Sequence, residues 1–215
     1  MALDKKTQPL HTDIILIDIV SYSLLPDEIQ LATALIINDG LVEAVELTGL
    51  PIGRQDQPLV RGFVPTGDGF YVILEEGYSG LGILVALGLR NILLFKGRQF
   101  KTPYAGVRAS VHHGSAIPFT DVTGRENYVG SGLNDCARLQ SLPAELKEMG
   151  EVFSGDANWV NVSQECWKNT QKNPRFSVFQ PTSLRISNDR VVRDKHGVAH
   201  NFYFIEISRQ WVSGL

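Results

Sequence analysis

Two aspartates stand where the sequence predicts strands to end, and carboxylates in such positions are typical of a metal site. Asp18 closes the apolar run Ile14–Asp18, and burying a carboxylate there is costly unless a cation or a metal meets it. Asp68 lies between two glycines, in a turn that joins two strand-like runs. Divalent Mg²⁺ or Mn²⁺ suits two adjacent carboxylates when phosphates complete the ligand set. Taken singly, Asp18 also fits a helix cap and Asp68 a simple turn, so only the pair carries this interpretation.

A second set of polar side chains shares one face of a predicted helix. Asn134 and Arg138 are four residues apart, which places both near the beginning of a helix over 133–142. An amide and a guanidinium in that position suit a ribose and a triphosphate. A solvated helix face would carry the same residues, and the pair alone does not decide between the two.

The elements that must position these residues follow the order β-α-β-β-α-β, with short additional elements. Strands are expected at 14–18, 59–66, 70–75, 106–113, 127–129, 159–162 and 202–207, and helices at 27–38, 81–94, 133–142 and 163–172. Asp39-Gly40 is expected to end or interrupt the first helix. This order predicts an α+β fold with a ferredoxin-like core, an antiparallel sheet backed by helices. We expect a single domain over residues 1–215, with its core at about 13–207.

Composition excludes several classes of protein. The 215 residues contain 20 Lys and Arg against 23 Asp and Glu, a net charge of −3, which gives no electrostatic basis for nucleic-acid binding. The longest apolar runs are far too short to span a membrane, and the N-terminus lacks the apolar region of a secretory signal. Cys136 and Cys166 are expected as reduced thiols. These features predict a soluble, cytoplasmic protein.

Four motifs in order along the chain resemble the catalytic domains of class III nucleotidyl cyclases, the adenylate and guanylate cyclases. They are Asp18–Ser23, similar to D-I-x-x-[FY]-[ST]; Thr66–Phe70, the G-D hairpin; Val107–Gly114, similar to R-x-x-[IV]-H-x-G; and Val129–Leu139, similar to [VI]-G-x-x-[VL]-N-x-A-[AS]-R-[LM]. Cys136 departs from the last pattern, where the family has a small residue such as Ala. The resemblance runs from about Asp13 to Ile207, which is nearly the whole chain.

The resemblance implies a role for each matched residue. Asp18 and Asp68 would bind two divalent ions, Mg²⁺ or Mn²⁺, with the Ile19 carbonyl as a further ligand. Asn134 and Arg138 would orient the ribose and stabilise the transition-state phosphate.

Two further residues would bind phosphates: Lys195 the terminal ones, and Arg125 another. The reaction would cyclise a nucleoside triphosphate to its 3′,5′-cyclic monophosphate and pyrophosphate. Because the family builds each site from two subunits, a head-to-tail homodimer with two composite sites is implied.

The positions that contact the base depart from both purine patterns. Val64 stands where adenylate cyclases carry Lys and guanylate cyclases carry Glu. Asn127 stands where adenylate cyclases carry Asp or Thr and guanylate cyclases commonly carry Cys. An apolar wall suits a smaller pyrimidine, with Arg61 or Tyr22 reaching inward. In lacking an attached sensor domain, the chain is similar to the stand-alone bacterial pyrimidine cyclases of anti-phage defence. That resemblance favours UTP as substrate and a cyclic-nucleotide-responsive effector as downstream partner. The alternatives are an adenylate or guanylate cyclase of relaxed base selectivity and a non-catalytic nucleotide-sensing module.

Overall fold

A nine-stranded sheet is the central layer of the computed structural model, which describes residues 8–47, 59–99, 107–148, 159–176, 184–187, 190–193 and 197–207. The strands are β1 (Leu10–Ile19), β2 (Val60–Pro65), β3 (Gly69–Leu74), β4 (Val107–Thr120), β5 (Glu126–Val129), β6 (Val160–Ser163), β7 (Leu184–Ile186), β8 (Arg190–Arg193) and β9 (Ala199–Ile207). The helices are α1 (Asp27–Leu47), α2 (Gly82–Gln99), α3 (Ser131–Glu148) and α4 (Gln164–Lys172), with short 3-10 turns η2 (Tyr22–Leu24) and η3 (Glu76–Tyr78).

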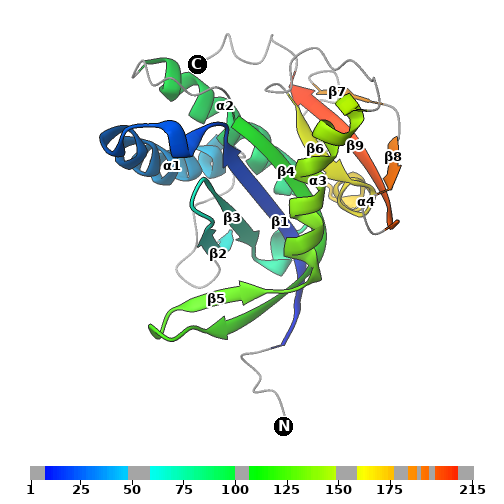
Figure 1. Cartoon of the computed structure of the whole chain (residues 1–215). Helices are drawn as coiled ribbons and strands as arrows, with labels where there is room; N and C mark the ends of the chain where they lie inside the picture. Colours follow the sequence, from blue (N-terminus) through cyan, green and yellow to red (C-terminus); the bar gives the residue numbers. More distant parts are fainter. Residues whose placement is uncertain are drawn as a thin grey trace.

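The first six long elements form the predicted ferredoxin-like unit. Their order is β1, α1, β2, β3, α2 and β4, and the strands lie side by side as β2-β3-β1-β4, all antiparallel (Figure 1). The sheet continues through β6, β9 and β7, while β5 pairs with β4 and β8 with β9. The pair β4 and β6 is parallel, because the chain between them crosses over through α3. The α+β fold with a helix-backed sheet is confirmed.

Apolar side chains on both faces of β1 explain why its sequence is a continuous apolar run. Ile15 and Ile17 pack with α1, α2 and α4, whereas Ile14 and Leu16 pack with α3 on the opposite face. Successive side chains of a strand alternate between faces, so Asp18 follows Leu16 towards α3. In Figure 1 α3 crosses the near face of the sheet.

Several elements are longer than the sequence predicts. The first helix continues through Gly40 to Leu47 rather than ending there, because glycine allows close packing against α2. A Cβ at Gly40 would lie 3.3 Å from Cγ2 of Ile92. The strand predicted to end at His113 continues to Thr120, since its second half pairs with β5 in a hairpin. The short strands β7 and β8 were not predicted.

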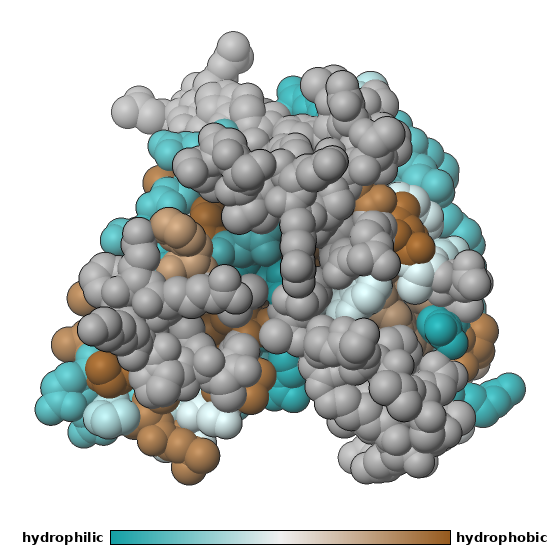
Figure 2. Space-filling model, turned by 90° about the horizontal axis from the view of Figure 1, so that it is seen from above, coloured by the Kyte–Doolittle hydropathy of each residue, from teal (hydrophilic) through white to brown (hydrophobic). Residues whose placement is uncertain are grey.

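The described surface carries scattered apolar side chains. In the view of Figure 2 the hydrophobic residues that can be seen lie in several separate groups rather than in one continuous area. Exposed examples are Leu31 and Leu35 of α1 and Phe95 of α2. None of the helices in the described part of the chain has the length and apolar content needed to span a bilayer.

Candidate active site

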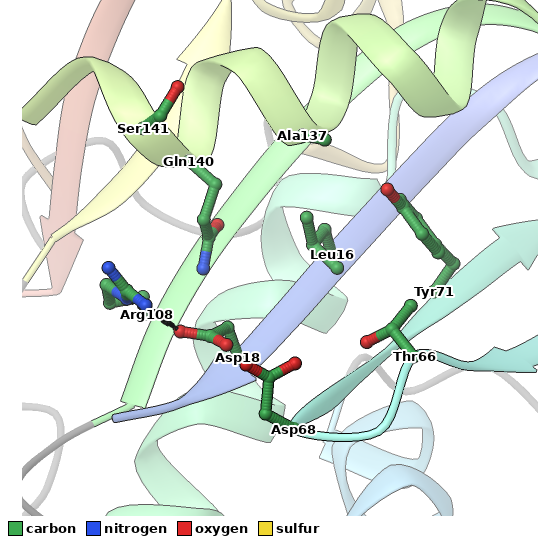
Figure 3. Close-up of a pocket in the computed structure, with 9 residues that line it drawn as sticks. All are labelled: Leu16, Asp18, Thr66, Asp68, Tyr71, Arg108, Ala137, Gln140 and Ser141. Carbon is green, nitrogen blue, oxygen red and sulfur yellow. Dashed lines mark hydrogen bonds and ion pairs between the residues drawn. The ribbon is translucent and has the colours of Figure 1, made fainter. Parts of the chain in front are cut away.

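Asp18 and Asp68 come together because of how β1 pairs with the β2–β3 hairpin. Asp18 lies opposite Gly69 in the antiparallel pair, and the backbone N–H of Ile19 donates to the carbonyl oxygen of Asp68 at 2.9 Å. Only glycine fits opposite Asp18, since a Cβ at Gly69 would lie 2.1 Å from the carbonyl oxygen of Ile17. Figure 3 shows the two carboxylates side by side. The predicted juxtaposition of the strand-end carboxylates is therefore present in the structure.

Arg108 forms the main charge contact of this site. It is the cross-strand neighbour of Asp18 on β4, and its Nε donates to Oδ2 of Asp18 at 2.7 Å, while its Nη2 contacts the same oxygen. Asp18 is only 8% exposed. Burial raises the pKa of Asp18 above its ordinary value, and the nearby Asp68 carboxylate adds to the rise, whereas the Arg108 guanidinium opposes it. The Arg108 guanidinium is therefore the cation that balances Asp18 within the chain.

A pocket of about 240 Å³ opens over these carboxylates on the α3 face of the sheet (Figure 3). Its floor comes from β1, β3 and β4, one wall from the hairpin turn and the other from α3. The lining residues are Leu16, Asp18, Thr66, Asp68, Tyr71, Arg108, Ala137, Gln140 and Ser141.

The donor set of the pocket fits a divalent cation only in part. Asp18 and Asp68 supply two carboxylates and Thr66 a hydroxyl, and these hard oxygens suit Mg²⁺ or Mn²⁺. Ile19, whose carbonyl oxygen is the further predicted ligand, ends β1 and is 1% exposed as a whole residue. Among the described residues no group of three or more His, Cys, Asp or Glu side chains is placed to hold a metal. Phosphates and water would therefore have to complete the coordination.

Asn134 and Arg138 lie in the first turns of α3 and do not line this pocket. Asn134 is exposed, and Arg138 is half-buried with its Nη1 2.7 Å from Oδ1 of Asp135. Within one chain the structure therefore does not bring the predicted ribose and phosphate residues to the predicted metal residues.

Val64 and Asn127, the predicted base-contacting residues, lie on β2 and β5. Val64 is half-buried and lies opposite Tyr71 in the β2–β3 pair, packed against the apolar cluster beneath α3. Asn127 is half-buried, and its Oδ1 accepts a hydrogen bond from the backbone N–H of Tyr128 at 2.8 Å.

Arg61 and Tyr22 already have partners within the chain. The Arg61 guanidinium lies 3.9 Å from Glu75 and 3.5 Å from Glu126. The hydroxyl of Tyr22 donates to the carbonyl oxygen of Gln30 on α1 at 3.2 Å. Neither residue lines the carboxylate pocket, so the suggestion that they reach the base stays a prediction.

The predicted phosphate residues lie elsewhere. Arg125 is exposed in the turn between β4 and β5, where its backbone N–H donates to Oδ1 of Asp121 at 3.2 Å. Lys195 lies outside the described residues. Their contacts with phosphate stay predictions.

Arg108 and Gln140 are pocket residues to which the sequence analysis assigns no role. Arg108 belongs to the strand motif around His112, but its contact with Asp18 depends on the register of two strands 90 residues apart. Gln140 lies two positions beyond Arg138 on α3, buried to 8% exposure. Residues two apart on a helix point to nearly opposite sides, so the motif residue Arg138 gave no signal for Gln140.

No protein-family model and no curated protein sequence matches the chain. Solved structures with a similar fold include nucleotide cyclases. The guanylyl cyclase Cya2 superposes with a TM-score of 0.66 at 10% identity, over 96% of this chain and 97% of that one. The adenylyl cyclase CyaB from P. aeruginosa gives 0.63 at 13% identity, over 97% and 98%. The guanylate cyclase domain of RhGC from Catenaria anguillulae, solved with GTP, gives 0.58 at 12% identity, over 94% and 100%. The fold is that of class III cyclase catalytic domains.

Proposed function

We propose that the protein is a nucleotidyl cyclase that converts a nucleoside triphosphate to its 3′,5′-cyclic monophosphate and pyrophosphate. The observation that carries this proposal is the pairing of Asp18 with Asp68 above the sheet of a cyclase fold, in a pocket open to solvent. A buried carboxylate next to a second one is suited to a divalent cation that arrives with a triphosphate.

The reaction joins the 3′-oxygen of the ribose to the α-phosphorus and breaks the bond from that phosphorus to the leaving pyrophosphate, while the 3′-hydroxyl proton is lost. Two divalent ions, Mg²⁺ or Mn²⁺, would lower the pKa of that hydroxyl and neutralise the triphosphate. Asp18 and Asp68 would hold them, with the Ile19 carbonyl as a further ligand. Asn134 would orient the ribose, and Arg138 and Lys195 would stabilise negative charge on the phosphates.

A head-to-tail homodimer would complete the site. Asn134 and Arg138 do not line the carboxylate pocket of their own chain, so a second copy has to supply them. The β4–β5 hairpin projects from the body of the molecule (Figure 1) and exposes Phe119, Val122 and Val129. An exposed apolar arm of this kind is suited to contact with the second copy.

UTP is the favoured substrate in this proposal. Val64 packs with apolar neighbours and offers no hydrogen bond to a base, so the charged contact that reads a purine at this position is missing. A smaller pyrimidine tolerates that wall, with Asn127 as its polar contact. The cyclic product would act on a cyclic-nucleotide-responsive effector, as in anti-phage defence.

Incubation of the purified protein with Mn²⁺ and equimolar ATP, GTP, CTP and UTP, followed by mass spectrometry of the products, tests both levels of the proposal. Cyclic UMP as the main product is expected. Cyclic AMP or cyclic GMP as the main product would reject the pyrimidine preference and keep the cyclase. If nucleotides bind but no cyclic product forms, the protein is a nucleotide-sensing module instead.

A further inference from the structure

Gln140 is a buried polar side chain whose amide has no hydrogen-bond partner in the described part of the chain. It is 8% exposed, and both its Nε2 and its Oε1 are unpartnered there. Buried amides are normally satisfied, because an unmade hydrogen bond leaves the full desolvation penalty. Figure 3 shows the side chain hanging from α3 towards Asp18 and Arg108. The amide therefore points to a partner that enters the pocket from outside.

The neighbours of Gln140 already have other partners or are apolar. Arg108 donates to Asp18, and the hydroxyl of Ser141 donates to the carbonyl oxygen of Arg138 at 2.8 Å. Leu16 and Ala137 offer no polar side-chain atom. An apolar side chain on α3 would fill the same space without an unpaired amide, so the amide is suited to contact with a polar ligand.

The charge of the pocket indicates which ligand that is. Two carboxylates and one guanidinium line it, which leaves one negative charge when both acids are ionised. A hydrated divalent cation is complementary to that charge. Water on such a cation would donate hydrogen bonds to Oε1 of Gln140, and Nε2 would donate to an anionic oxygen beside the ion.

We propose that Gln140 is a cation-positioning residue whose amide hydrogen-bonds the hydration shell of a divalent ion held by Asp18 and Asp68. This inference rests on the proposed function, because it takes the carboxylate pair as the cation site. Gln140 acts on the ion through the water molecules that the ion holds. A lone water molecule in the pocket would not link the Gln140 amide to cation binding.

Mn²⁺ titration of the full chain, followed by electron paramagnetic resonance of the free ion, tests the inference together with thermal unfolding. Gln140→Leu should weaken Mn²⁺ binding by about tenfold, the loss of one hydrogen bond to a charged group. Its melting temperature without Mn²⁺ should equal or exceed that of the wild type, because an unpartnered amide is removed. A merely structural glutamine would not combine these two results. Gln171→Leu makes the same exchange on an exposed position of α4 and should leave Mn²⁺ binding unchanged.

The outcomes separate this inference from the proposed function. If Asp68→Asn abolishes Mn²⁺ binding but Gln140→Leu binds as the wild type does, the role of Gln140 is overturned and the cation site stands. If the wild type binds no Mn²⁺, or Asp68→Asn binds as tightly, both fail. The double variant Arg108→Met, Gln140→Leu should bind Mn²⁺ about tenfold more weakly than Arg108→Met alone. Loss of that effect would mean that Gln140 acts on Arg108, which overturns direct contact with the hydrated ion.

Discussion

Asp18 is a buried carboxylate, and burial disfavours its charged form. Its carboxylate is almost entirely removed from water and lies near a second carboxylate, and both raise its pKa. Arg108 stabilises the charged form through two contacts to one carboxylate oxygen. A divalent cation would compensate the charge more strongly, and Arg108 would then compete with that cation for the same carboxylate.

Asp68→Asn and Asp18→Asn should each lower the rate of cyclisation by at least about a hundredfold, since each removes one charged ligand of the cation. Asp68 is exposed, so Asp68→Asn should unfold at the temperature of the wild type. Product formation with Mn²⁺ and UTP, with circular dichroism as the control for folding, checks both. Wild-type rates in either variant would reject the two-carboxylate site.

Arg108→Met should make the cation-free protein less stable, by about 1 to 3 kcal/mol, because the buried Asp18 carboxylate loses its partner. The same variant should gain more stability from Mn²⁺ than the wild type does, since the competing guanidinium is gone. Thermal unfolding with and without Mn²⁺ measures both effects. An equal rise in melting temperature for the two proteins would show that Arg108 does not compete with the ion.

Residues with a local signal could be predicted from the sequence, and those defined by long-range pairing could not. Asp18 ends an apolar run and Asp68 sits in a glycine turn, so each position is visible within a few residues. Arg108 meets Asp18 only through strand register, and Gln140 faces the pocket only because α3 crosses that face of the sheet. Neither relation can be inferred from neighbouring residues.

At the scale of elements, the β2–β3 hairpin is what places Asp68. The turn residues and the two flanking strands could be predicted, because Gly67-Asp68-Gly69 between two strand-like runs is typical of a hairpin turn. The strands β7 and β8 could not, since they are three and four residues long and rich in arginine. The low helix propensity of glycine opposes the continuation of α1 through Gly40. That continuation depends on packing against α2, which is a long-range contact.

Gly69→Ala should disrupt the site without removing any polar side chain. The added Cβ would lie 2.1 Å from the carbonyl oxygen of Ile17, so β3 must move away from β1 and carry Asp68 with it. We expect a loss of about 1 to 3 kcal/mol in the free energy of unfolding, together with loss of cyclisation. Urea unfolding and product assay check the two effects.

The matched control for Gly69→Ala is Gly77→Ala, in the turn before α2. A Cβ at Gly77 meets no atom within 4 Å among the described residues, and its φ is not in the left-handed region. This exchange should leave stability and activity near the wild-type values. If Gly69→Ala behaves in the same way as Gly77→Ala, close strand approach does not hold Asp68 in place.

At the scale of the whole molecule, the two faces of the sheet are covered by different helices. Helices α1, α2 and α4 cover one face, with a large apolar core, while α3 covers part of the other and leaves the pocket beside it. The α3 residues proposed for catalysis lie outside that pocket, and in the proposed function a second chain supplies them.

Two inactive variants should therefore restore activity when they are mixed. In a heterodimer of Asp18→Ala and Arg138→Ala chains, one composite site contains both defects and the other contains neither. After equal mixing with free exchange, half of the dimers are mixed and each has one intact site, so about a quarter of wild-type activity is expected.

Co-expression with two different affinity tags and sequential purification isolates the heterodimer for assay. Asp18→Ala mixed with Asp68→Asn is the control, because both defects fall on the same half of the site and no intact site forms. If the isolated Asp18→Ala and Arg138→Ala heterodimer is no more active than this control, each site lies within one chain and the composite arrangement is wrong.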